Sequence, residues 1–356
     1  MIETMEHGIS LLPDCRPEQR TPAEYYRDAI AISKFSDDAG LGYVKMTEHY
    51  LGDYGGYCPS PLTFLTAVAA QTSRIRLMTG ALLPAFHHPI QLAAHIAQVD
   101  AISGGRVDAG FGRAWLPYEF DAFKVPMDES RARYEATIEA VVRLWTEEKV
   151  SENTPFFSYT DATSLPPVTQ RPHPPVWGAA VKSPESFTWL ATKGFGVMLA
   201  LAPARQYTSV SRHLVDHYRE VFTATHGTAR TPRIAMSTPL YIARTDAEAY
   251  RLAEPFYREY LRVWTEAARS WRDTSSSGYV GYESMGRDMK HLGSFDVKRY
   301  GTAVIGSPES AVEQIHELHE TYGADTYLWN VDFGGQNYEQ MHTSMKLFVD
   351  EVLPKL

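Results

Sequence analysis

The chain of 356 residues has only two cysteines, Cys15 and Cys58, and it lacks any long apolar run. Two cysteines are too few for a disulfide framework and are typical of a reducing compartment. No stretch approaches the roughly 20 consecutive apolar residues that a membrane span needs. The first residues include acids and do not resemble a signal peptide. We therefore expect a cytoplasmic protein without a membrane anchor.

Basic residues are also few. The 34 Lys and Arg residues against 43 Asp and Glu residues give a formal net charge of −9, and no polybasic run is present. This balance argues against nucleic acid or an anionic membrane as a partner. The adjacent residues His87 and His88 have no accompanying third ligand pattern, so we expect no metal site and interpret them as the entry to a helix.

Three common motifs are missing. The sequence has no Gly-x-Ser-x-Gly, no Walker-type loop, and no Gly-x-Gly-x-x-Gly after its first expected strand. Serine-hydrolase and P-loop chemistry are therefore not expected, and a dinucleotide-binding fold is disfavoured.

What the chain does have is a regular alternation of short apolar runs and helical patterns. The runs predict eight strands, at residues 8–12, 43–47, 75–80, 107–112, 176–181, 197–201, 234–243 and 326–331. Repeated strand–helix units form a parallel sheet, and eight units in a chain of this length favour a closed barrel. We predict an α/β fold, a (β/α)8 TIM barrel, in a single domain over residues 1–356.

Two segments interrupt the alternation. Residues 153–175 are rich in proline, serine and threonine and show no helical pattern, so we interpret them as an excursion within the domain after the fourth helix. Residues 269–300 are irregular and contain several glycines and tyrosines. A long irregular segment in a compact domain is usually functional, and we expect a lid over a binding site here.

Candidate binding residues follow the fourth expected strand. Gly112 leaves room for close approach of another backbone or a flat ligand. Arg113 comes directly after it and offers a permanent charge with forked donors, which suits a phosphate. The alternative is an arginine paired with an acid at the edge of the core.

The junction after the fifth strand is a second candidate. Lys182 and Ser183 precede a helix that Pro184 opens, and Ser186 lies in its first turn. Free backbone N–H groups and the helix dipole favour a phosphate at such a position. The same Ser-Pro-Glu pattern is also an ordinary helix cap, and it recurs at Ser307.

His49 follows the second strand, beside a loop rich in glycine and tyrosine. A histidine exchanges protons near neutral pH and is therefore a candidate for acid–base work. The alternative is a structural histidine held by hydrogen bonds.

Taken together, four stretches resemble the bacterial luciferase-like family of flavin-dependent monooxygenases: residues 47–50, 104–120, 172–186 and 344–348. The resemblance implies a (β/α)8 barrel that binds reduced FMN (FMNH2) at the carboxyl ends of its strands. It places Gly112 at the cofactor and His49 at the oxidation step. It assigns to the FMN phosphate the side chains of Arg113, Lys182, Ser183 and Ser186.

The resemblance also implies a reaction. A separate flavin reductase supplies FMNH2, O2 adds to it to give a C4a-hydroperoxyflavin, and an organic small molecule is oxidised with His49 assisting proton transfer. Dimers are usual in the family, so we expect a homodimer. Tyr50, Gly112 and Lys182 stand where luciferase has a second histidine, a reactive cysteine and an acid. These departures weaken the case for a long-chain aldehyde substrate and for light emission.

Two alternatives stay open at this point. Part of the same family uses the deazaflavin F420 for hydride transfer, which gives an F420-dependent oxidoreductase as the first alternative. The second is a non-catalytic flavin-binding subunit of a heterodimer, against which the retained His49 argues. The sequence does not identify the substrate.

Overall fold

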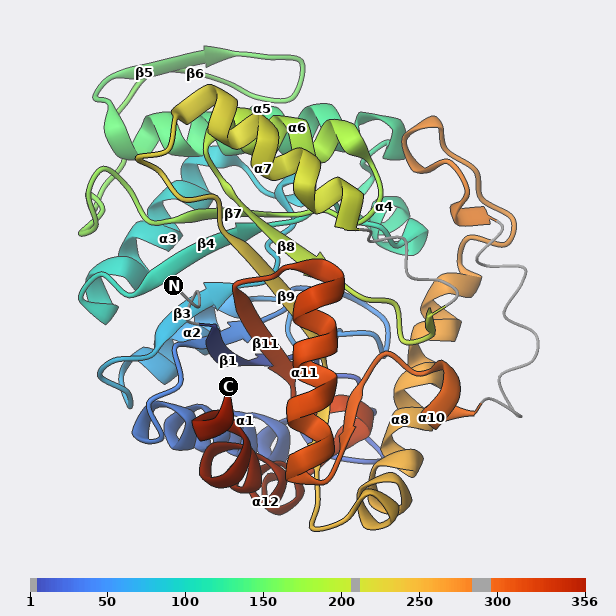
Figure 1. The fold of residues 1–356 in the computed structure, drawn as a ribbon. Helices are drawn as coiled ribbons and strands as arrows, with labels where there is room; N and C mark the ends of the chain where they lie inside the picture. The colour runs from blue at the N-terminus through green and yellow to red at the C-terminus, as the bar shows by residue number, and fades with distance from the viewer. Residues whose placement is uncertain (1–4, 206–211, 284–295) are drawn as a thin grey trace.

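The computed structural model describes residues 5–205, 212–283 and 296–356. In this part of the chain, eight parallel strands close into a barrel, because β8 pairs with β9 as well as with β7 (Figure 1). The predicted (β/α)8 barrel is confirmed. In ring order the strands are β1 (Glu6–Leu11), β2 (Tyr43–Met46), β3 (Arg76–Thr79), β4 (Val107–Phe111), β7 (Val176–Ala179), β8 (Gly196–Ala200), β9 (Ile234–Ile242) and β11 (Thr326–Asn330).

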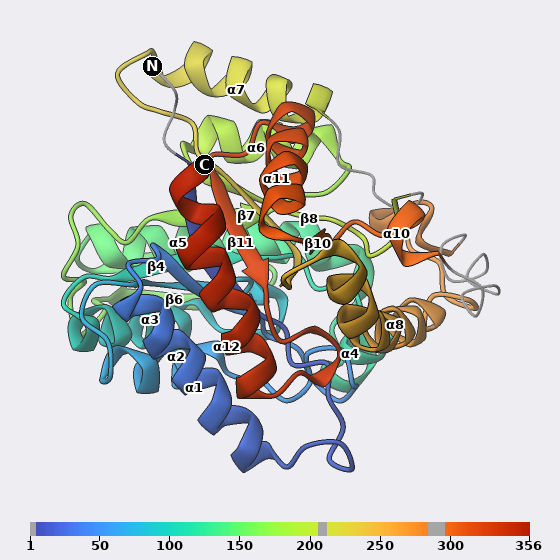
Figure 2. The ribbon, with the colours of Figure 1, turned by 60° about the horizontal axis from the view of Figure 1, so that its bottom comes forward.

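Helices cover the outside of the barrel. α1 begins at a capping box, in which the Thr21 hydroxyl accepts from the Glu24 N–H and the Glu24 carboxylate accepts from the Thr21 N–H. α1 and α12 lie side by side, so the first and last long helices close the outer layer (Figure 2). The helices are α1 (Pro22–Asp38), α2 (Pro61–Ala69), α3 (Pro89–Ser103), α4 (Pro117–Phe123), α5 (Ser130–Thr146), α6 (Pro184–Lys193), α7 (Arg212–His226), α8 (Asp246–Arg269), α10 (Val297–Tyr300), α11 (Pro308–Tyr322) and α12 (Tyr338–Leu347).

The strands are buried on both faces, as expected for a parallel barrel. Alternate residues such as Ile9 and Val44 belong to the apolar layer between strands and helices. The residues between them fill the barrel, including Met78, Trp177 and Leu328. Because side chains fill the interior, functional groups are confined to the two ends of the barrel.

Three strands lie outside the ring and were not predicted. β5 (Val150–Asn153) and β6 (Ser158–Ala162) form an antiparallel hairpin that lies beyond α5 (Figure 1). Their residues are mostly exposed and polar, so they lack the apolar alternation that reveals a strand. β10 (Val304–Gly306) adds to β9 and is too short to give a pattern. The excursion is therefore helix-free as predicted, but part of it is a hairpin.

Two predicted segments are only partly described. The sequence also predicts a helix over residues 205–226. Its described part is α7, which begins at Arg212, and residues 206–211 lie outside the described residues. The expected lid over residues 269–300 includes residues 284–295, which also lie outside them. Within the described residues, no helix combines the length and the apolarity needed to cross a membrane.

Candidate functional site

The predicted site residues all follow the carboxyl ends of barrel strands. His49 follows β2, Gly112 and Arg113 follow β4, and Lys182 follows β7. Parallel strands bring these ends to one face of the barrel, where TIM-barrel chemistry takes place. The arrowhead of β8 in Figure 1 points to the side on which α8 lies. The structure therefore brings the predicted residues to the same end.

Arg113 contacts no acid among the described residues. Its Nη2 donates to Ser130 Oγ at 3.0 Å and to the Gly278 carbonyl at 2.9 Å. Its guanidinium lies 4.6 Å from the centroid of the Tyr279 ring. Its Nε is buried without a hydrogen-bond partner. The alternative of an arginine paired with an acid is therefore not what the described residues show.

The two predicted serines share a cation that the sequence analysis missed. Arg131, in the first turn of α5, donates from Nη2 to Ser183 Oγ at 2.9 Å. Its Nη1 donates to Ser186 Oγ at 3.2 Å. A guanidinium with a fixed charge thus lies against the N-terminus of α6. We call the following five side chains the cationic cluster: Arg113, Arg131, Lys182, Ser183 and Ser186.

The two Ser-Pro-Glu segments differ in how they use their serine. The Ser307 hydroxyl caps α11 by accepting from the Ser310 N–H at 3.3 Å. The Ser183 side chain makes no capping bond to α6 and instead donates to Glu185 Oε2 at 2.6 Å. The N-terminal backbone donors of α6 therefore lack the side-chain cap that an ordinary helix start of this type has.

Part of the predicted lid covers the cationic cluster. We call residues 276–282 the covering segment. Lys182 Nζ donates to the Val280 carbonyl at 2.7 Å, lies 4.3 Å from the centroid of the Tyr282 ring, and has its pKa lowered by burial. Asp128 Oδ1 anchors the start of the segment by accepting from Ser276 Oγ at 2.6 Å and the Ser277 N–H at 3.0 Å.

His49 is buried and bonded to a buried carboxylate. Its Nδ1 lies 3.0 Å from Glu119 Oε1, which also accepts from the Tyr50 N–H at 2.8 Å. Glu119 Oε2 is buried without a partner. The Tyr54 ring lies 4.9 Å from the His49 ring and 5.5 Å from that of Trp115. This geometry fixes the orientation of the imidazole.

Gly112 is required by packing within the protein. A Cβ on Gly112 would lie 2.9 Å from the Ala81 Cβ, closer than such atoms approach. The Gly112 N–H also donates to the Leu82 carbonyl at 2.8 Å. The end of β4 and the chain after β3 therefore approach closely, and a contact of Gly112 with a cofactor stays a prediction.

Comparison with known proteins identifies the family. The model of the family described as luciferase-like monooxygenase matches residues 5–325. This chain belongs to that family. The predicted family and enzyme class are confirmed.

Among relatives, the luciferase-like chain is 25% identical to the oxygenase component of flavin-dependent trigonelline monooxygenase from Acinetobacter baylyi, over 95% of this chain and 91% of the relative. It is 24% identical to the FMNH2-dependent dimethylsulfone monooxygenase of Pseudomonas putida, over 87% of this chain and 84% of that one. The crystal structure of monooxygenase RslO1 from Streptomyces bottropensis matches with a TM-score of 0.83 at 34% identity, covering 99% of each chain.

Sequence reasoning missed Glu119 and Arg131, although both left a signal. Leu116 and Pro117 start a helix soon after Arg113, which places Glu119 in a first turn at the same end of the barrel. Arg131 is a cation in the first turn of α5, where it opposes the helix dipole. Its ion pair with Glu135, one turn along the same helix, is longer at 3.6 Å than its bonds to Ser183 and Ser186.

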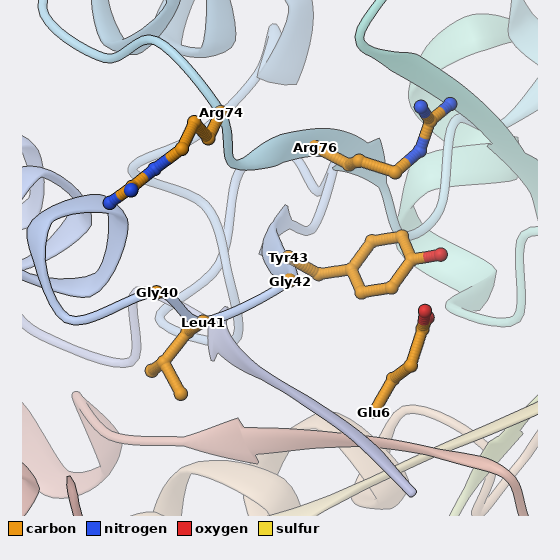
Figure 3. A pocket seen from close by; sticks show the side chains of 7 residues that line it. All are labelled: Glu6, Gly40, Leu41, Gly42, Tyr43, Arg74 and Arg76. Carbon is orange, nitrogen blue, oxygen red and sulfur yellow. The ribbon is translucent and has the colours of Figure 1, made fainter. Parts of the chain in front are cut away.

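A cavity of about 340 Å³ lies at the opposite end of the barrel (Figure 3). It opens beside the starts of β1, β2 and β3 and is lined by Glu6, Gly40, Leu41, Gly42, Tyr43, Arg74 and Arg76. None of the predicted site residues lines it. Its arginines already bind protein oxygens, Arg74 at the Asp37 carbonyl and Arg76 at Asp108. We therefore place the candidate site at the other, carboxyl end.

Proposed function

We propose that this luciferase-like protein is the oxygenase component of an FMN-dependent monooxygenase that acts on an organic small molecule. The cationic cluster carries the proposal. Two guanidinium groups and an ammonium group match the charge of an FMN phosphate. The two serine hydroxyls and the uncapped N-terminus of α6 supply further donors. The buried, unpartnered Nε of Arg113 supports the presence of a ligand at this place.

A bound phosphate would replace the present acceptors of two cations. Arg113 and Lys182 now donate to the backbone carbonyls of Gly278 and Val280. Phosphate oxygens are charged acceptors, so they add to each of these hydrogen bonds an ion-pair attraction that a neutral carbonyl lacks. Arg113 and Lys182 would therefore hold the phosphate in place of the Gly278 and Val280 carbonyls.

When bound, reduced FMN supplies the reaction with O2 that prepares an oxygen atom for transfer. The chain supplies the surroundings. His49 carries its proton on Nδ1, toward Glu119, and presents Nε2 as an acceptor. It moves a proton during oxygen transfer, while Glu119 holds its tautomer and orientation. The oxygen-transfer route that the resemblance implies stays a prediction.

The proposal includes a separate flavin reductase that delivers FMNH2, since a relative is named as an oxygenase component. It also includes a homodimer, as the family resemblance implies, and a cytoplasmic location. Both cysteines are free and buried, which agrees with a reducing compartment.

Oxygen uptake tests the proposal. The protein is mixed with a flavin reductase, NADH and FMN, and candidate substrates are screened under ¹⁸O2. We expect substrate-dependent oxygen uptake above that of the reductase alone, with one ¹⁸O atom in the product. Turnover with reduced F420 and none with FMNH2 would contradict the proposal.

A histidine variant tests the role of His49. In His49→Ala, FMN affinity is expected to stay within about threefold of wild type. The rate of product formation should fall by about 100-fold or more, as is typical for the loss of a general acid or base. His88→Ala is the matched control, because His88 is an exposed cap of α3. A His49→Ala protein with full turnover would refute the proposed role.

A further inference from the structure

The interior of the barrel at its carboxyl end has a polar half and a small-residue half. Four strands that are neighbours in the ring, β9, β11, β1 and β2, each contribute one polar residue to the interior. Ser10 stands opposite both Lys45 and Asn330 in the strand register. We call the four residues the polar quartet: Ser10, Lys45, Ser237 and Asn330.

The polar quartet points inward by strand alternation. The neighbours of these residues, such as Ile9, Val44, Met236 and Trp329, belong to the outer apolar layer. At or just after the ends of the other four strands, the interior residues have little or no side chain: Gly80, Gly110, Ala179 and Ala200. Lys45 takes the space beside Gly80, and Met198 lies against Gly110. Ala200 is exposed, so solvent reaches the barrel interior on the small-residue half. A flat ring that entered from this side would meet the quartet with its polar edge.

Lys45 crosses the interior as an extended side chain. A Cβ on Gly80 would lie 2.2 Å from Lys45 Cδ, so the glycine lets the lysine pass. Lys45 Nζ reaches Ser237 Oγ on β9, at 2.9 Å. The residue is 8% exposed, and no carboxylate of the described residues lies within 4 Å of its ammonium group. One of its three donors is thus used, by a neutral partner.

Two other members of the quartet have unused acceptors. Ser10 Oγ and Asn330 Oδ1 are both buried without a hydrogen-bond partner. Buried polar atoms are normally paired, and unpaired ones call for an explanation such as a ligand. Burial lowers the pKa of Lys45 to about 8, partly offset by Asp332, so the amino group is mostly protonated at pH 7. A buried cation with no carboxylate in direct contact is costly unless a ligand supplies the charge.

We propose that Lys45 is the counter-ion of the reduced flavin, which the polar quartet holds by its polar edge. This inference rests on the proposed function. Reduced FMN carries a negative charge on its ring near neutral pH, whereas the oxidised ring is neutral. A cation next to the ring therefore binds the reduced form more tightly than the oxidised form, and the protein tunes the cofactor in this way.

The ratio of affinities for reduced and oxidised FMN tests the inference. Both dissociation constants are measured by titration, the reduced one anaerobically, for wild type and for Lys45→Met. We expect Lys45→Met to weaken the binding of reduced FMN by about tenfold, as for the loss of a charged hydrogen bond. The binding of oxidised FMN should weaken by less than about threefold. A tenfold fall in the affinity for reduced FMN relative to oxidised FMN lowers the two-electron midpoint potential of the bound flavin by about 30 mV.

Three further variants complete the experiment. Lys34→Met removes a lysine from the exposed side of α1 and should leave the ratio at the wild-type value. Ser237→Ala removes the hydrogen-bond partner but keeps the ammonium group, so the ratio should not fall. Lys45→Gln removes the charge but keeps a polar side chain. It replaces Lys45→Met if the methionine variant does not fold, and the same fall in the ratio is expected.

The outcomes are distinct. A lysine variant that weakens both forms equally, or neither, overturns the role of Lys45 while wild-type binding of FMN still supports the proposed function. A folded wild-type protein that binds neither form of FMN overturns both proposals.

Discussion

Arg131 offers the sharpest test of the cationic cluster, because its predicted contribution depends on the phosphate alone. The side chain is 34% exposed and donates to Ser183 at 2.9 Å and to Ser186 at 3.2 Å. A charge-assisted hydrogen bond contributes about 1.5–3 kcal/mol, and partial exposure to solvent places Arg131 at the lower end of that range. We therefore expect Arg131→Met to raise the Kd of FMN by about tenfold.

The assay compares FMN with riboflavin, which has the same ring but no phosphate. Arg131→Met should lower the affinity for FMN by about tenfold and change the affinity for riboflavin by less than about twofold. Arg133→Met is the matched control on the same helix, since Arg133 bonds to Glu129 at 2.9 Å and lies over the Phe156 ring at 4.7 Å. Equal weakening of FMN and riboflavin, or no change in either, would refute the reasoning.

Three other predictions follow from single contacts. Glu119→Met should lower kcat by about 100-fold or more with FMN affinity unchanged, because His49 loses the acceptor that fixes its tautomer; an unchanged kcat would contradict this. Burial lowers the pKa of His7 from 6.5 to about 4, so the unfolded state binds the proton first and the free energy of unfolding falls as the pH drops from 6.5 to 4. Relative to His7→Phe, wild type should lose about 2–3 kcal/mol between pH 7 and pH 4.5 in urea titrations, and parallel pH profiles would contradict it. Gly80→Ala should destabilise the protein by about 1–3 kcal/mol because its methyl group meets Lys45, and the double variant with Lys45→Ala should recover stability in the same titration.

The barrel was predictable because its strands are short apolar runs buried on both faces. Residues 107–111 are all buried in the structure, and the sequence shows this as a run with a single acid. The β5–β6 hairpin gave no such pattern, because one face of a surface hairpin needs no apolar residues when little packs against it. The sequence pattern therefore predicted the strands that are buried in the core and missed the strands that lie at the surface.

The candidate site was predictable where function follows directly from a strand end. Arg113 and Lys182 come just after β4 and β7, and the topology of the barrel brings them to one face. Glu119, Arg131 and Lys45 required coordinates, because the helix register and the path of a long side chain decide their contacts. Lys45 could have been noticed in the sequence, because it is the single charged residue in the otherwise apolar strand β2. A lysine in a buried strand is rare and indicates a special role, but the strand pattern does not show its contacts.

The covering segment belongs to residues 269–300, the second of the two segments that interrupt the strand–helix alternation in the sequence. The carbonyls of Gly278 and Val280 bond to Arg113 and Lys182, and Tyr279 and Tyr282 lie over the same two cations. The prediction of a segment over the site thus agrees with the contacts of its described part. The Tyr279 hydroxyl also donates to the Ala114 carbonyl, which ties the segment to the chain that follows β4.

A crystal structure of the protein with bound FMN tests the central claim most directly. It should show the phosphate within hydrogen-bond distance of Arg113, Arg131 and the two serines at the start of α6, with the flavin ring at the carboxyl end of the barrel beside His49. A phosphate bound elsewhere, or FMN in the cavity at the opposite end, would contradict the proposed site.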